Sequence, residues 1–439
     1  MSAQVTSGKV TTSNAGEAPK LDPMEWSIGA SPHLYGSRPV RSYIIEVTLD
    51  APVEETPLQE AVDKTVERMP YYLQTFACEK GLYYDAKNDL PLTIAHSAEL
   101  RQLGTAEVNW HMIDVTYDGG VIYFAAAHAL ADGESFTNFV QTVLYYYFCA
   151  KDHTTYSSKG IVTLETPRAE DELVDVFAQK RKSYVFSLAR TVFNTHSALP
   201  ENKQPYPDYR TRYPLRVPTN ELLGWAKGHG ASPASAVAGM IAKAVMRENP
   251  TLRGKLTVCV QISMRRLLGV PHTLKNCVGA AYLPFDKKTV VQTPTGQLAS
   301  EARASLREQL TEEYANKMAG MQSFAFRAGK LIRPLRNLCM GVLELCPFNT
   351  VSVDYAGRPA MGEYESQVKS ISYYFSEVFK GSLYLIMSEC AGSFLINFNQ
   401  SFETDRYYRA FLRVLEEEHI SYEELPAVRY LTPEVVQQH

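Results

Sequence analysis

One short stretch constrains the fold more than any other part of the sequence. An apolar run, Val121 to Phe124, continues through three alanines to His128, and Asp132-Gly133 follows before a helical pattern that begins at Glu134. The apolar run predicts a buried strand, and the Asp-Gly pair predicts a sharp turn into a helix. We therefore expect His128 at the end of a buried strand, where the turn can hold its ring rigidly in a cleft.

The H-x-x-x-D-G spacing in this stretch leaves several chemical roles open. A histidine with an ordinary pKa of about 6.5 is largely neutral at pH 7, so His128 can take a proton from an alcohol or an amine as a general base. Asp132 could orient that histidine as in a hydrolase triad, tie the turn to an arginine elsewhere, or cap the following helix. Gly133 removes a side chain where the backbone must turn.

The sequence offers no nucleophile for a covalent mechanism. It contains no G-x-S-x-G elbow, and no serine or cysteine has a convincing partner. Direct transfer of an acyl group from a thioester to an acceptor needs only one base, positioned substrates and a donor to the oxyanion. The pattern therefore favours direct acyl transfer over a covalent acyl-enzyme.

The chain of 439 residues is long enough for two lobes of roughly 150–200 residues each. Residues 1–20 are Ser/Thr/Gly-rich and are expected to be a disordered tail. Residues 21–175 are expected to form the first lobe, residues 176–209 a crossover linker, and residues 210–439 the second lobe. Both halves mix helices with several strands, which predicts two α+β lobes of similar kind.

Periodicity and turn signals predict the individual elements. Strands are expected at residues 41–49, 72–77, 82–86, 108–116, 121–127, 211–217, 256–262, 278–284, 349–355, 370–374, 382–390 and 393–400. Helices are expected at residues 57–69, 134–150, 170–189 and 219–227, from 233 onward, and at 297–331 and 405–418. Ser232 is expected to cap the helix that starts at Pro233. The tyrosine runs at 145–147 and 373–374 are expected to pack within helices and sheets.

Composition excludes several classes of function. The net charge of -4 shows none of the basic excess typical of nucleic-acid-binding proteins. No apolar run reaches the roughly 18 residues that a membrane span needs. The N-terminus lacks the apolar core of a signal peptide. The seven cysteines show no C-x-x-C pair, so we expect reduced thiols in a cytoplasmic protein, without a disulfide framework or a metal site.

Several motifs in the correct order resemble the CoA-dependent acyltransferase superfamily, which includes chloramphenicol acetyltransferase, plant BAHD acyltransferases, peptide-synthetase condensation domains and bacterial alcohol acetyltransferases. The resemblance is closest to the bacterial alcohol acetyltransferase-like group and runs from about residue 36 to 425. The matching segments are residues 68–76, 127–133, 230–233, 262–267 with 273–276, 351–359 and 397–402.

The resemblance implies two chloramphenicol-acetyltransferase-like lobes with a tunnel at their interface and His128 midway along it. His128 would deprotonate an alcohol or amine acceptor, which then attacks an acyl thioester. Asp132 would point away from His128 and pair with Arg265 of the second lobe, with Arg266 as the alternative. Acyl-CoA would be a co-substrate rather than a bound cofactor, the acceptor a small molecule, and the protein a monomer.

Ser352 or Asn276 would donate to the oxyanion or line the tunnel, although either residue could equally be a satisfied buried polar group. Three positions depart from the family pattern. Ala127 replaces the first of two adjacent histidines found in condensation domains, Gln74 replaces an arginine, and Asp354 to Gly357 only loosely match a plant-type D-F-G-W-G segment. Two alternatives therefore stand beside acyl-CoA transfer: a condensation-type domain that uses carrier-protein thioesters, and a catalytically silent homologue that binds a small molecule.

Overall fold

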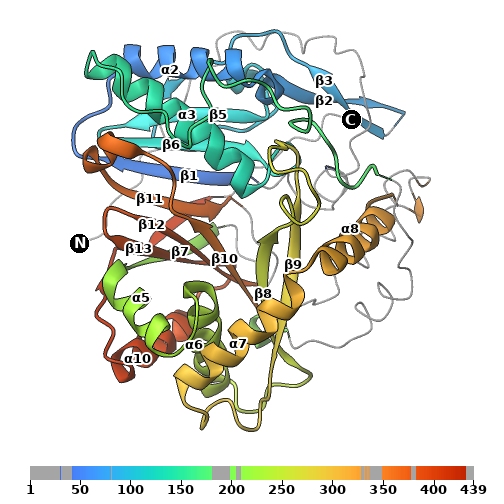
Figure 1. The fold of residues 1–439 in the computed structure, drawn as a ribbon, viewed down its shortest axis with the longest axis vertical. Coiled ribbons are helices and arrows are strands. Elements are labelled where there is room, and N and C mark those ends of the chain that lie inside the picture. The colour runs from blue at the N-terminus through green and yellow to red at the C-terminus, as the bar shows by residue number, and fades with distance from the viewer. Residues whose placement is uncertain are drawn as a thin grey trace.

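The computed structural model describes residues 30, 42–80, 82–179, 198–203, 209–327, 331, 334–335, 349–376 and 382–431. In these parts of the chain two sheets lie one above the other, each with helices on the side away from the other sheet (Figure 1). The expected tail at residues 1–20 lies outside the described residues, as does most of the expected linker. The mixture of sheets and helices confirms the predicted α+β class.

The first sheet has five strands. In spatial order they are β11 (Val368–Phe375), β1 (Ser42–Leu49), β6 (Val121–Ala127), β5 (Ile113–Asp118) and β4 (Ala95–His96). Helices α2 (Glu55–Arg68) and α3 (Gly133–Lys151) cover its outer face (Figure 1). Strands β5 and β6 form a hairpin, because they pair antiparallel with Asp118 opposite Val121.

Strand β11 comes from the second half of the chain but completes the sheet of the first half. It pairs antiparallel with β1, so that Phe375 lies opposite Tyr43 and Val368 opposite Leu49. Its side chains Ile371, Tyr373 and Phe375 belong to the core of the first lobe. The first lobe is therefore completed by a segment more than 200 residues beyond its helices, and the division of the chain at residues 175 and 210 stays a prediction.

The second sheet is larger and mixed. In spatial order its strands are β14 (Glu423–Glu424), β7 (Tyr209–Pro218), β13 (Ser393–Gln400), β12 (Leu383–Cys390), β10 (Val351–Gly357), β8 (Leu256–Ser263) and β9 (Val278–Phe285), with β15 (Val428–Leu431) also paired to β7. Strand β10 runs parallel to both of its neighbours, and the other pairs are antiparallel. A separate hairpin joins β2 (Gln74–Glu79) and β3 (Leu82–Lys87).

Helices cover the outer face of the second sheet (Figure 1). They are α5 (Thr219–Gly228), α6 (Pro233–Glu248), α7 (Thr295–Gln309), α8 (Glu312–Phe326) and α10 (Arg406–Glu417), with short 3-10 turns elsewhere at η1 (Pro70–Leu73), η2 (Ala106–Val108), η3 (Pro200–Lys203) and η5 (Gly362–Gln367). Helix α6 begins as predicted: Ser232 caps it, its hydroxyl and that of Ser235 form a capping box, and Pro233 is the first helical residue.

Two predicted helices need correction. Residues 170–178 of the expected helix at 170–189 form successive turns instead, and residues 180–189 lie outside the described part. The Glu172 side chain is held by Arg68 at 2.6 Å, and the Glu172 carbonyl accepts from Leu274, so contacts to both halves of the chain replace the helix. The expected helix at 297–331 is broken, because Thr311 caps a second helix by accepting from Tyr314 N–H.

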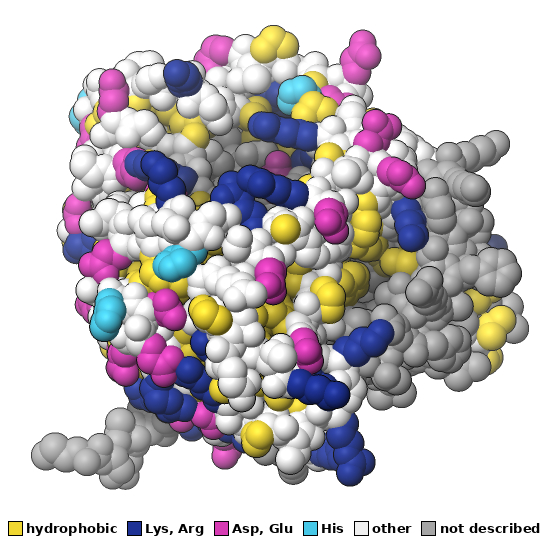
Figure 2. Space-filling model, turned by 60° about the horizontal axis from the view of Figure 1, so that its bottom comes forward, with side chains coloured by type: hydrophobic (Ala, Val, Ile, Leu, Met, Phe, Trp, Pro, Cys, Tyr) yellow, Lys and Arg dark blue, Asp and Glu magenta, His cyan; other side chains and the backbone are white. Residues whose placement is uncertain are grey.

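The face seen when the bottom of Figure 1 is turned forward carries basic and acidic side chains side by side, with Lys and Arg gathered around a hollow in its upper half (Figure 2). This mixture agrees with the small net charge of -4. Among the described residues, no helix combines the length and the apolar character needed to cross a membrane.

Candidate active site

Strand β6 carries His128 to the boundary between the two lobes. The strand stays in register with β1 up to Ala127, which pairs with Ser42. The turn then closes, because Leu130 N–H donates to the Ala127 carbonyl at 2.8 Å. His128 Nδ1 lies 3.2 Å from the Ala131 carbonyl oxygen. Since a carbonyl can only accept, this contact places the proton of the neutral ring on Nδ1 and leaves the Nε2 lone pair as the basic site.

Two aromatic rings pack against the imidazole. The Phe375 ring stacks on it with centroids 5.9 Å apart and planes 12° apart, and the Tyr43 ring meets it edge-on at 6.2 Å. Phe375 also touches Tyr384 of β12 at 5.6 Å. The imidazole of His128 is therefore held by side chains from β1 and β11, and through Phe375 it is linked to the second sheet.

Asp132 is fully buried and uses both carboxylate oxygens. Oδ1 accepts from the backbone N–H of Ser135 at 3.0 Å, which caps helix α3, and from Arg265 Nη2 at 2.8 Å. Oδ2 accepts from the backbone N–H of Cys277 at 2.8 Å. Burial alone would raise the pKa of Asp132, but the Arg265 charge and these hydrogen bonds outweigh it and lower the pKa below its ordinary value.

Arg265 is also buried, and its guanidinium makes several polar contacts. Besides Asp132, its guanidinium donates to the carbonyls of Thr273 at 3.0 Å and Lys275 at 3.1 Å, and it lies 3.5 Å from the Glu134 carboxylate. Burial would lower the pKa of Arg265, yet the neighbouring Asp132 raises it. Arg266, the alternative partner, is exposed. The Asp132 carboxylate therefore does two of the things expected of it: it caps helix α3, and it forms an ion pair with Arg265.

The requirement for glycine at position 133 has a different cause from the one expected. The φ angle of Gly133 does not lie in the left-handed region, so the backbone turn alone does not demand glycine. A Cβ atom there would lie only 2.6 Å from the Tyr43 hydroxyl and 2.8 Å from the ring carbon that bears it. Glycine is needed because the Tyr43 phenol occupies the space beside the start of α3.

Ser352 and Asn276 both lie in the second lobe. Ser352 is buried on β10, and its hydroxyl accepts from Asn349 Nδ2 at 2.9 Å. Asn276 Oδ1 accepts from Val278 N–H at 3.2 Å, one residue from the Cys277 N–H that binds Asp132. The loop of Asn276 therefore reaches the turn that carries His128, whereas the side-chain hydrogen bond of Ser352 is local, to Asn349 just before β10.

Sequence reasoning missed three residues of this region. Tyr43 and Phe375 border the imidazole, and Asp354 lies on β10 with its carboxyl electrostatically coupled to Tyr43 and Asp132. Burial, with a smaller contribution from the Asp132 charge, raises the pKa of Asp354 to about 7. The only signal in the sequence was the loose match of Asp354 to a family segment, and that match did not indicate which residues Asp354 would lie near.

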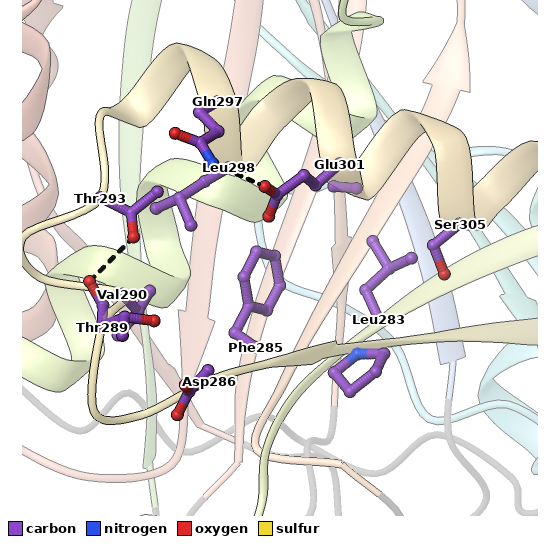
Figure 3. Close-up of a pocket in the computed structure, with 12 residues that line it drawn as sticks. Leu283, Phe285, Asp286, Thr289, Val290, Thr293, Gln297, Leu298, Glu301 and Ser305 are labelled. Atoms are coloured by element: carbon purple, nitrogen blue, oxygen red, sulfur yellow. Dashed lines mark hydrogen bonds between the residues drawn. The ribbon is translucent and has the colours of Figure 1, made fainter.

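A hollow of about 190 Å³ lies elsewhere in the second lobe, between the end of β9 and helix α7 (Figure 3). Strand β9 starts beside Asp132, and the hollow begins at Leu283, near its other end. At about 3.3 Å per residue the two places are roughly 15–20 Å apart. The hollow is thus separate from His128. Within the described residues, no group of three or more potential ligand side chains is arranged to hold a metal ion.

No family model matches the sequence, and no curated protein matches it at a significant level. Solved structures do match. Polyketide synthase associated protein 5 from Mycobacterium tuberculosis is 15% identical, with a TM-score of 0.64 over 89% of this chain and 98% of that one. TRI101 from F. sporotrichioides, crystallised with coenzyme A and T-2, is 13% identical, with a TM-score of 0.59 over 91% and 99%.

The first condensation domain of the CDA synthetase is also similar, at 15% identity and a TM-score of 0.58 over 92% of this chain and 96% of that one. These matches span nearly the whole of each protein. The chain therefore shares the fold of these three structures, which agrees with the fold that the resemblance implied.

Proposed function

We propose that this protein is an acyltransferase that moves an acyl group from a CoA thioester to the hydroxyl or amino group of a small acceptor. The observation that carries the proposal is the state of His128. Its Nδ1 is directed at the Ala131 carbonyl, which leaves Nε2 as the base, and the Asp132 carboxylate is bound to Arg265, Ser135 and Cys277. This is a single histidine held by its turn rather than a triad.

The proposed reaction needs one proton acceptor that later returns its proton. Nε2 of His128 takes the proton from the acceptor as the acceptor oxygen or nitrogen bonds to the thioester carbonyl carbon. The tetrahedral intermediate then collapses, the carbon–sulfur bond breaks, and the proton on Nε2 passes to the leaving thiolate. The products are the acylated acceptor and the free thiol, and His128 ends in its starting state.

Asp132, Gly133 and Arg265 support this step from a distance. Asp132 and Arg265 fix the turn that carries His128, and Gly133 lets the Tyr43 phenol pack beside it. Asn276 is the better candidate for the oxyanion donor, because its loop also supplies the N–H that binds Asp132. Ser352 remains a candidate for the tunnel wall on the inner face of β10.

The CoA donor is supported by TRI101, whose structure contains coenzyme A. A carrier-protein thioester is the second candidate donor, because a condensation domain matches over 92% of the chain. Ala127 weighs against that candidate, since condensation domains usually carry a histidine at this place in their motif. A silent homologue that only binds a small molecule is disfavoured by the intact geometry around His128.

Thiol release from a panel of acyl-CoAs, acetyl to palmitoyl, with mixed alcohols and amines separates these readings. The proposal expects release that depends on the acceptor and on the acyl chain. The same assay with acyl carrier proteins as donors tests the condensation-type alternative. Thiol release from carrier-protein thioesters alone would identify a carrier protein, not CoA, as the donor. Ligand binding without any thiol release would contradict acyl transfer altogether.

A further inference from the structure

Strand β10 presents two faces to different parts of the molecule. Val351 and Val353 belong to the core of the second lobe. Ala356, on the opposite face of the strand, packs against the core of the first lobe, and so does Ile386, which pairs with Asp354 on the neighbouring strand β12. Because side chains alternate along a strand, Asp354 lies on the face opposite Val353 and points, like its partner Ile386, toward the first lobe.

Within the described parts of the chain, the carboxylate of Asp354 has no cation beside it. Among the described residues no Lys, Arg or His forms an ion pair with it, and its one hydrogen bond comes from the Tyr355 backbone N–H. The titratable groups that act on it or feel its charge are Tyr43, Tyr373, Cys259 and Asp132, from four different parts of the chain. All four are neutral or negative near pH 7, so none can balance the charge.

An unpaired carboxylate in a largely buried place is costly unless a partner neutralises it. Asp354 is nonetheless partly exposed to solvent. The Tyr43 hydroxyl nearby is buried and has no hydrogen-bond partner in the described structure. Both observations indicate a polar site in which the protein itself supplies neither a counter-charge for Asp354 nor a hydrogen-bond partner for Tyr43.

The surroundings indicate which chemistry would complete it. The Tyr43 ring contacts the Tyr373 ring at 6.1 Å and the Phe375 ring at 5.1 Å. These rings are buried, so they form the apolar surroundings of the site, and the carboxylate supplies the charge that an organic ammonium group needs. Tyr43 also meets the His128 ring edge-on, so it links the place beside Asp354 to the base.

We propose that Asp354 binds an ammonium group of the acceptor, so that the preferred acceptors are amino alcohols or diamines. The neutral hydroxyl or amine lies at His128 while the cation lies against Asp354. This inference rests on the proposed acyl transfer and names the acceptor class for the same site. A bound cation would lower the pKa of Asp354 from about 7, because it favours the ionised carboxylate.

The test compares choline with its neutral carbon isostere, in which a tert-butyl group replaces the trimethylammonium group. Only the hydroxyl of either compound can accept an acyl group, and the two differ in charge alone. The ratio of their kcat/KM values should favour choline in the wild type and fall by about tenfold or more in Asp354→Asn, which corresponds to about 1.4 kcal/mol. Asp354→Ser serves as a second variant if the first fails to fold.

The matched control is Asp286→Asn, which removes a carboxylate at the hollow beyond β9 and should leave the ratio unchanged. A ratio that does not move in folded Asp354 variants would overturn the inference. If no acceptor supports thiol release, the proposed function fails first, and calorimetry with choline then tests the subsite alone. Equal choline binding by the wild type and Asp354→Asn, or none by either, would overturn it.

Discussion

Asp132 and Arg265 are 133 positions apart in the sequence, and their side chains meet at 2.8 Å in the interior of the molecule. The same carboxylate caps helix α3 and accepts the backbone N–H of Cys277 just before β9. One buried ion pair therefore ties the turn that carries His128 to the second lobe. The position of the proposed base depends on contacts that only the folded, two-lobed chain supplies.

Asp132→Asn should lower the free energy of unfolding by about 3–5 kcal/mol, because it leaves the buried Arg265 charge without its partner. Urea denaturation followed by circular dichroism measures the loss. Glu134→Gln is the matched control, since Glu134 is half exposed and 3.5 Å from Arg265, and it should cost less than about 1 kcal/mol. If Asp132→Asn reduced the rate but left stability intact, a triad-like role for Asp132 would be preferred.

Gly133→Ala should destabilise the protein by about 1–3 kcal/mol, because the added methyl group overlaps the Tyr43 phenol. Tyr43→Phe removes the hydroxyl, the nearer of the two close atoms, and should restore part of the loss in the double variant. Thermal or urea unfolding of the single and double variants measures this coupling. Additive effects of the two substitutions would show that the phenol is not what excludes a side chain at position 133.

Asp354 should make the protein less stable as the pH rises from about 4 to about 7. The unfolded chain releases this proton near pH 3.9, whereas burial raises the pKa of Asp354 to about 7 in the folded protein. Between these values the folded state holds a proton that the unfolded state has lost, so its contribution to the free energy of unfolding falls with increasing pH.

Asp354→Asn removes this contribution, so the wild type and the variant should differ most in stability at pH 7 and above, where the variant is the more stable. Urea denaturation at a series of pH values from 4 to 8 measures the difference in stability between the two proteins. The titration of all other groups is common to both and cancels in that difference. A stability difference independent of pH would show that Asp354 titrates at its ordinary value in the folded protein.

Local patterns predicted most strands and the capped start of α6, because those signals lie within a few residues of each element. Ser232 and Pro233 start α6 where expected, and the alternation in residues 41–49 and 121–127 corresponds to β1 and β6. The resemblance paired Asp132 with Arg265, and the structure places the two together. The failed helix at 170–178 shows the limit, since Glu172 binds Arg68 across 104 positions.

The rest of the site depends on how distant strands meet. The strand at 370–374 was expected from its own residues, but nothing in them indicated that β11 joins β1 and brings Phe375 onto the His128 ring. For the same reason the Tyr373-Tyr374 run predicted that these rings would be packed but not which residues they would pack against. Asp354 became visible as a site residue only when the alternation of β10 could be compared with the cores on either side.

The most direct test of the account is the acceptor-dependent rate of thiol release by His128→Ala, measured with the best donor and acceptor of the wild type. His96→Ala is the matched control, because His96 is exposed on β4 at the far edge of the same sheet. We expect a loss of about two to four orders of magnitude for His128→Ala with unchanged thermal stability, and no loss for the control. Full activity in a folded His128→Ala variant would contradict the central claim.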